Sequence, residues 1–217
     1  MKKIFLFVSL FLCLSISAQD STAVKKSTVF IDVHAGPGMR LGKQAPPDNN
    51  SYYGNYSGDV RNGFQLDVSL YLEVVPRHSM SLKYNKWNKS FGIRGVNEGM
   101  TDDITLSFYG IGYMFTNQEM AHSMWSVEGS LGYMTYKDQM KVGTNEIKVT
   151  GNTIGVFLGG AYYFKLFKGV YLGPKLSLLV GGISKFNTDE PGMTQIETEQ
   201  PESMSRLDIS LGLRFKL

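Results

Sequence analysis

The chain has 217 residues, with 22 Lys and Arg against 19 Asp and Glu, and 42% of its residues are hydrophobic. A mean hydropathy of −0.13 excludes a protein of many membrane-spanning helices, and a formal charge of +3 is too small to indicate a nucleic-acid-binding surface. Aromatic residues make up 12% of the chain, and its 24 glycines exceed the average share of about 7%, which favours a protein rich in strands and turns.

The first 18 residues have the pattern of an export signal. Lys2 and Lys3 precede an apolar stretch at 4–14, and small residues end the segment at Ala18. We expect cleavage after Ala18 to leave a short tail, 19–27, ahead of a single domain at 28–217. The one cysteine lies within the signal, so the exported chain is expected to have no disulfide.

Eight segments of the exported chain alternate between apolar residues and polar or small ones, which is typical of strands with two different faces. The last segment is the most regular, because apolar residues occupy every odd position from Leu207 to Leu217. The other seven lie, in chain order, at about 29–36, 64–74, 80–85, 103–115, 125–133, 154–164 and 170–184. No segment has a convincing helical periodicity.

Two of these segments break the alternation. Between 103 and 115 the large apolar residues change phase after Phe108, which predicts either a bulge or a face on which Gly110 and Gly112 leave room for large neighbours. Pro174 lies in the apolar series of 170–184, where it cannot donate a ladder hydrogen bond. We therefore expect a local bulge at Pro174.

The connections between the predicted strands alternate in length. Four of them are long and polar, at about 40–62, 90–102, 137–149 and 185–205, and three are short, at about 75–78, 116–123 and 165–169. This alternation predicts an antiparallel up-and-down order, with every long loop at one end of the sheet and both termini at the other.

The apolar face of such a barrel points inward in a lipocalin-like soluble protein and outward in a membrane protein. We favour the membrane barrel, because strands of about 10–14 residues can cross a bilayer when tilted, and because export without cysteine fits an outer membrane. Aromatic residues near the strand ends are also candidate interfacial girdles. They comprise Phe64, Tyr84, Trp87 and Tyr133 toward the long loops, and Phe115, Trp125, Tyr162, Phe164, Phe167 and Phe215 toward the short turns.

The polar face would then fill the lumen, which in an eight-stranded barrel is just wide enough for side chains. Acidic and basic residues are nearly balanced on this face, so we expect a network of salt bridges and no wide aqueous pore. The predicted network comprises Asp32, Asp67, Glu73, Lys83, Glu128, Lys175, Asp208 and Arg214.

His34 is the candidate for chemistry on this face. Asp32 lies two residues away on the same face, and closure of the barrel brings Ser69 and Ser210 near from the neighbouring strands. A Ser-His-Asp arrangement that acts on lipid is therefore an alternative to a structural lumen histidine, which we favour. The other two histidines lack metal-ligand spacing, and the sequence has no cofactor motif, so we expect no metal and no cofactor.

Two long loops have compositions that suit external contacts. The segment 44–59 holds three tyrosines among Asn, Gly and Ser, a mixture that adapts to partners. The segment 187–204 carries five acidic residues and no basic one, but it lacks the spacing of an EF-hand, so a solvated acidic loop is favoured over a calcium site. We expect an extracellular ligand or surface to meet the protein through 40–62 and 185–205.

The chain resembles the eight-stranded outer-membrane β-barrel family of Gram-negative bacteria, the OmpA/OmpX-like barrels. The resemblance rests on the signal end at 17–19, on the strand end Gly-Ile-Gly-Tyr-Met-Phe at 110–115, and on the terminal strand at 207–217. It implies an all-β, antiparallel up-and-down transmembrane barrel. It also implies that the insertion machinery reads the last strand through Leu213, Phe215 and Leu217, although an aromatic residue ends the chain in that family.

These features together predict a small, monomeric outer-membrane barrel with periplasmic termini, surrounded by outer-membrane lipid and serving a structural or interaction role. We expect no enzymatic activity and no nucleic-acid partner. The alternatives are a lipid-modifying enzyme that uses His34, and a narrow channel or transporter of small hydrophobic ligands.

Overall fold

The computed structural model describes residues 28–42, 61–92, 100–117, 122–142, 145–189 and 195–217. The predicted export signal, the tail at 19–27 and most of the loop at 40–62 lie outside these residues. The described chain forms ten antiparallel strands in one sheet. They are β1 (Val29–Arg40), β2 (Asn62–Val75), β3 (His78–Gly92), β4 (Met100–Asn117), β5 (Ser123–Val142), β6 (Asn145–Phe167), β7 (Val170–Val180), β8 (Gly182–Thr188), β9 (Gln195–Ser203) and β10 (Arg206–Lys216). Over the same residues, no helix has the length and apolar character needed to cross a membrane.

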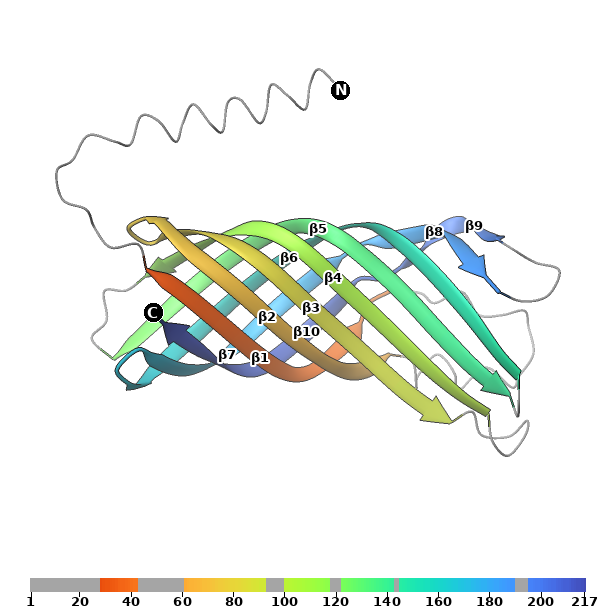
Figure 1. Cartoon of the computed structure of the whole chain (residues 1–217), viewed down its shortest axis with the longest axis horizontal. Coiled ribbons are helices and arrows are strands. Elements are labelled where there is room, and N and C mark those ends of the chain that lie inside the picture. Colours follow the sequence, from red (N-terminus) through yellow and green to blue (C-terminus); the bar gives the residue numbers. More distant parts are fainter. Residues whose placement is uncertain (1–27, 43–60, 93–99, 118–121, 143–144, 190–194) are drawn as a thin grey trace, which may run out of the picture.

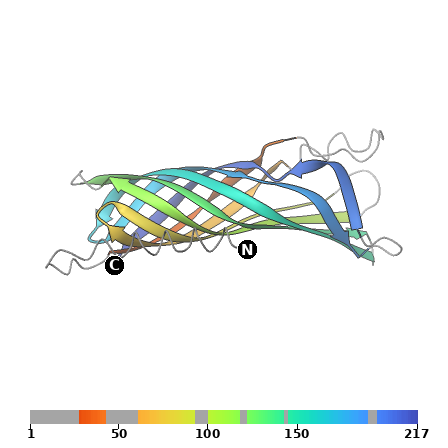
Figure 2. The same cartoon turned by 90° about the horizontal axis from the view of Figure 1, so that it is seen from above.

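The sheet closes on itself as an eight-stranded barrel. Consecutive strands pair from β1 to β7, and the ring is completed by the pairs β7–β10 and β10–β1. The short strands β8 and β9 extend β7 and β10, so they add no strand to the ring. The predicted eight-stranded up-and-down barrel is therefore confirmed, with strands that slant across its long axis (Figure 1 and Figure 2).

The two ends of the barrel differ. β1 begins and β10 ends at the same end, where Pro76-Arg77 and Lys168-Gly169 make two-residue turns (Figure 1). Arg77 and Gly169 have φ values of 73° and 78°, which such tight turns require. We call this the turn end and the opposite end the loop end.

Several strands extend further at the loop end than the sequence predicted. β5 has 20 residues and β6 has 23, and they pair through most of the predicted loop 137–149. β9 and the second half of β8 lie in the predicted loop 185–205, where the two strands form a hairpin. These loop predictions are wrong because Lys137, Gln139 and Lys141 lie on the outward face of a strand whose inward face is mostly apolar, as at Met134 and Tyr136.

The barrel has two halves of opposite polarity. Toward the turn end, outward residues are apolar and exposed, as at Leu82, Ile111 and Leu211, and they form a belt around the barrel. Toward the loop end, the outward positions of β3 to β6 are polar, and the inward positions are mostly apolar, with Lys89, Asp102 and Asp138 among them. The apolar inward residues form one buried cluster of Trp87, Ile104, Leu106, Phe108, Met134, Tyr136, Phe157, Leu179, Ile183, Phe186 and Met204. We call the two parts the apolar belt and the protruding half.

This reversal explains the phase change at 103–115. β4 pairs with β3 and with β5 in unbroken register through Phe108 and Tyr109, so the strand has no bulge. Leu106 and Phe108 face the apolar interior of the protruding half, whereas Tyr109 and Ile111 face outward in the apolar belt. Of the two alternatives for this segment, the face with room at its glycines is confirmed, because a Cβ on Gly110 would collide with the ring of Phe108.

The bulge predicted at Pro174 is wrong. β7 pairs with β10 in unbroken register through Pro174, which lies opposite Leu211, and its register with β6 is the same on both sides of the proline. The missing N–H is accommodated by leaving out two pairs of the β6–β7 ladder rather than by inserting a residue. A register shift occurs instead beside the turn, between Lys165 and Phe167.

Aromatic side chains border the apolar belt at both edges. Toward the loop end, Tyr84, Tyr109 and Tyr133 are cross-strand neighbours on the outward face of β3, β4 and β5. Toward the turn end, the rings of Phe115 and Trp125 lie 5.6 Å apart. The girdle position predicted for Trp87 is wrong, because odd positions of β3 face inward. Its side chain is fully buried, and its Nε1 donates to the carbonyl of Gly38 at 3.0 Å.

Candidate functional site in the barrel lumen

An ion pair between the two strands that bear the termini fills the lumen near the turn end. Asp32 of β1 and Arg214 of β10 lie directly opposite one another, on the inward face of both strands. The guanidinium Nε and Nη2 donate to the two carboxylate oxygens at 2.7 and 2.6 Å. The guanidinium also lies 4.2 Å from the centre of the Tyr163 ring and 5.5 Å from those of Phe30 and Tyr71. This fully buried pair combines bidentate geometry with cation–π contacts.

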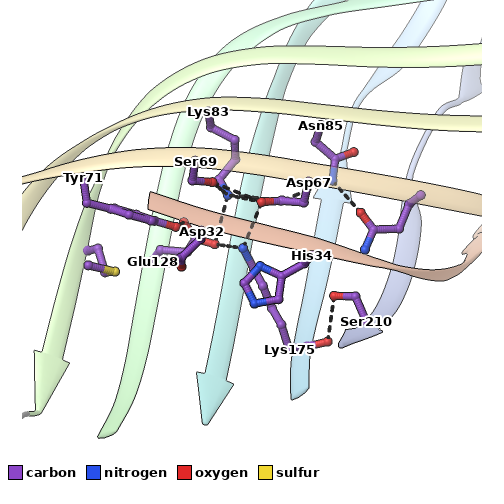
Figure 3. A network of polar contacts seen from close by, with 12 residues as sticks. Asp32, His34, Asp67, Ser69, Tyr71, Lys83, Asn85, Glu128, Lys175 and Ser210 are labelled. Carbon is purple, nitrogen blue, oxygen red and sulfur yellow. Dashed lines mark hydrogen bonds and ion pairs between the residues drawn. The ribbon is translucent and has the colours of Figure 1, made fainter. Parts of the chain in front are cut away.

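Two lysines and two carboxylates meet further along the lumen (Figure 3). Lys83 Nζ lies 3.2 Å from Asp67 and 3.1 Å from Glu128. Lys175 pairs with Asp67 at 3.3 Å and contacts Glu128 as well, so each lysine bridges both acids. Tyr71 adds a hydroxyl that donates to Glu128 at 2.6 Å. Four charges from four strands therefore neutralise one another in a largely buried site, in which the Glu128 side chain is 5% exposed.

A third group joins this cluster to the protruding half. Asn85 Nδ2 donates to Asp67 at 3.2 Å and to Gln65 at 3.1 Å, and its Oδ1 accepts from Arg206. Arg206 Nε also donates to Asp208 at 3.0 Å. The polar network thus continues from Asp67 to the level of the apolar cluster.

Most of the predicted network residues make buried ion pairs in the lumen. The exception is Glu73, whose carboxylate accepts from the backbone N–H of Arg77 at the exposed turn. The residues that pair in the lumen are Asp32, Asp67, Lys83, Glu128, Lys175, Asp208 and Arg214.

Sequence reasoning missed two buried arginines, Arg40 and Arg206. Arg40 ends β1 and reaches Glu202 at 3.3 Å. Both arginines continue the inward phase of their strands. Extending the alternation by one residue would have included Arg206, and extending it by four residues, from 36 to 40, would have included Arg40. They were missed because the predicted strands stopped short of these positions.

The structure does not assemble the Ser-His-Asp arrangement that the sequence left as the alternative to a structural histidine. Tyr163 lies between Asp32 and His34. Its hydroxyl donates to Asp32 at 2.8 Å and is 2.9 Å from His34 Nε2. Ser210 Oγ donates to the carbonyl of Lys175 at 3.4 Å, and Ser69 Oγ to Asp67 at 3.0 Å. No serine hydroxyl among the described residues is hydrogen-bonded to the imidazole, so the lumen lacks the nucleophile–base contact of a triad there.

The predicted insertion signal lies on the outer surface of β10. Leu213 and Phe215 point outward and are half-buried, and Leu217 is exposed. The backbone N–H of Leu217 donates to the carbonyl of Val29 at 2.9 Å, so the last residue is still tied to β1. Recognition of these residues by the insertion machinery stays a prediction. Within the described ranges, no group of acidic, His or Cys side chains has the geometry of a metal site.

No protein-family model and no curated protein matches this sequence. Among solved structures, a major outer membrane protein from Thermus thermophilus is 11% identical with a TM-score of 0.59, and the match covers 89% of this chain and 100% of that one. OprG from Pseudomonas aeruginosa is 10% identical with a TM-score of 0.55, over 88% of this chain and 95% of that one. Neisserial surface protein A is 10% identical with a TM-score of 0.53, over 90% of this chain and 100% of that one. The chain therefore has the fold of the small eight-stranded outer-membrane β-barrel proteins that its sequence resembles.

Proposed function

We propose that the protein is a monomeric, non-conducting outer-membrane barrel whose protruding half makes extracellular contacts. One observation carries the proposal. The strands β3 to β6 continue past the tyrosine row of the apolar belt, with a polar exterior and a buried apolar core. A wall of this kind is stable in water, so it supports surface contacts on a rigid scaffold rather than on loops alone.

We propose that the turn end, with both chain termini, lies in the periplasm. The two-residue turns at this end and the long hairpins at the other follow the usual asymmetry of outer-membrane barrels. Single-cysteine variants at Gln139 of β5 and at Lys168 of the turn test it, because Cys13 of the export signal is the one natural cysteine. A membrane-impermeant maleimide should label Gln139→Cys on intact cells and Lys168→Cys only after permeabilisation. The reverse pattern would overturn the orientation.

Contact through the protruding half is tested by shortening its longest hairpin. Residues 139–148 would be replaced by Asn-Gly, which favours a two-residue turn between the paired residues Asp138 and Val149. We expect cells that carry this variant to lose adhesion to other cells or to host-type surfaces, while the barrel still shows heat-modifiable migration on SDS gels. Equal adhesion by the wild type, the variant and cells without the protein would contradict a contact role.

We propose that the barrel does not conduct ions. The charges of the central lumen are paired with one another, and the apolar cluster of the protruding half occupies the interior beyond them. Recordings with the purified barrel in planar bilayers should stay at baseline in salt solution. A steady unitary conductance would instead support the narrow-channel alternative.

We also propose that His34 has a structural role. Its contact with Tyr163, and the hydrogen bonds that Ser69 and Ser210 make to other acceptors, support this role over catalysis. His34→Ala and the wild type should show the same absence of lipid hydrolysis and acyl transfer when the purified barrels are compared. Activity in the wild type that His34→Ala abolishes would restore the enzyme alternative.

A further inference from the structure

The outer face of β2 to β5 bears a hollow of about 640 Å³, within the size range of ligand pockets. Its floor is backbone, at Lys83, Gly110 and Gly132. Its walls are formed by two neighbouring cross-strand rows of side chains: one row is entirely aliphatic, and the other contains one valine and two tyrosines. The rows are Leu70–Leu82–Ile111–Leu131 and Val68–Tyr84–Tyr109. The hollow therefore opens into the apolar belt directly below the belt's tyrosine edge.

The outward positions just beyond the tyrosine row are basic and neutral. Two successive cross-strand rows of β3, β4 and β5 comprise Lys86–Ser107–Thr135 and Asn88–Thr105–Lys137. Neither row contains an acidic residue, and the first outward acid on these strands is Asp103, one row further toward the loop end. Two lysines and several hydroxyl or amide groups thus lie above the hollow without a compensating carboxylate in their rows.

We propose that the hollow and these two rows together bind one anionic, phosphate-bearing membrane lipid. An acyl chain occupies the hollow, and the phosphate lies between the ammonium groups of Lys86 and Lys137. Strands are about 4.8 Å apart, so β3 and β5 are separated by about 10 Å, and the rows of Lys86 and Lys137 are offset by two residues, about 7 Å along the strands. The resulting separation of about 12 Å is one that two lysine side chains can close around one phosphate. The phenol groups of Tyr84 and Tyr109 lie at the level where a lipid passes from chain to headgroup.

The arrangement favours a lipid over other anions. A free phosphate would leave the hollow unused, because the walls of the hollow offer it mostly hydrocarbon. A soluble acidic protein would have to enter the apolar belt, which faces lipid chains in the proposed membrane position. The headgroup attraction follows the general rule that each Lys near a membrane surface adds about 1 kcal/mol toward anionic lipid.

Lipid retention by the purified, folded barrel in neutral detergent tests the proposal. Native mass spectrometry would follow bound dipalmitoyl phosphatidic acid, with dipalmitoyl phosphatidylcholine and inorganic phosphate as comparison probes. The double variant Lys86→Gln/Lys137→Gln should weaken retention of phosphatidic acid about 30-fold, because two such lysines together contribute about 2 kcal/mol. Lys141→Gln, which removes an exposed lysine of β5 beyond these rows, is the matched control and should leave retention unchanged.

A second variant tests the hollow independently of charge. Ile111→Trp places a larger apolar side chain in its wall, and should reduce retention of the lipid while all charges stay in place. The proposal is overturned if the lysine double variant retains phosphatidic acid as well as Lys141→Gln does, if phosphatidylcholine is retained equally, or if inorganic phosphate displaces the lipid at matched concentration. Heat-modifiable migration of each variant shows that the barrel is folded. The maleimide test of orientation is independent of lipid retention, so failure of one proposal can be told from failure of the other.

Discussion

Asp32→Asn probes how strongly the lumen network holds the barrel together. The substitution keeps the shape of the side chain but removes the negative charge opposite Arg214, which is 1% exposed. Two charge-assisted hydrogen bonds of 2.6 and 2.7 Å are affected, and an amide can accept only one of them at its oxygen. The cation–π contacts with Tyr163, Phe30 and Tyr71 remain. Because removal of one partner from a buried pair costs about 3–5 kcal/mol, we expect a loss near the lower limit, about 3 kcal/mol.

The measurement is reversible urea unfolding of the barrel in phospholipid vesicles, followed by tryptophan fluorescence. Asp32→Asn/Arg214→Gln should recover part of the loss, so that the coupling free energy between the two positions is at least about 2 kcal/mol. Glu197→Gln is the matched control, because it breaks an ion pair with Lys185 of 2.5 Å that is more than 60% exposed on both sides. Exposed pairs contribute about 0–1 kcal/mol. If each single variant lowered the free energy of unfolding by less than about 1 kcal/mol and the two losses were additive, the inference that Asp32 and Arg214 form a coupled, water-excluded ion pair would be refuted.

Three further outcomes follow from the two-polarity barrel. Leu211→Arg, in the apolar belt, should lower the free energy of unfolding by about 2–4 kcal/mol in the same assay. Thr105→Arg, on the outward face of the protruding half, should change it by no more than about 0.5 kcal/mol. Equal changes would mean that both positions face the same solvent. Leu106→Ala, inside the protruding half, should lower the free energy of unfolding by about 2–5 kcal/mol because it leaves a cavity. An unchanged free energy of unfolding would show that water fills this interior. Gly212→Ala would place a Cβ against the ring of His34 and against the backbone carbonyl oxygen of Val33. It should lower the temperature at which the heat-modifiable form is lost, at a cost of about 1–3 kcal/mol; an unchanged temperature would mean that both the ring and the β1 backbone can shift.

Strand faces could be read from the sequence because the side chains of a strand alternate with a fixed period of two. The inward placement of Asp67, Lys83 and Arg214 follows from that period, and so does the outward placement of Leu211. Which acid pairs with which base could not be read in this way. It depends on the stagger between strands around the closed ring, and closure brings Glu128 of β5 within 3.1 Å of Lys83 of β3 although no sequence rule relates the two strands.

The candidate triad shows the limit of the same reasoning. Asp32 and His34 do share the inward face, as their spacing predicts. Tyr163, which lies far along the chain in β6, takes the hydrogen bonds of both. Neighbouring strands bring backbones close, but the direction of a serine hydroxyl is settled by the nearest acceptor, and for Ser210 that acceptor is the carbonyl of Lys175.

The sequence by itself determined that the chain is an antiparallel barrel of eight alternating strands with one apolar face. Alternation records the contrast between the two faces of a strand, but it does not record which solvent lies on each side. Only the tertiary structure decided that the contrast reverses along the barrel, at the row of Tyr84, Tyr109 and Tyr133. In the proposed membrane position, lipid surrounds the apolar belt, so the polar groups of its strands turn inward. Water surrounds the protruding half, so most of the inward side chains there are apolar. Strands that satisfy both conditions have the sequence pattern of loops or broken strands.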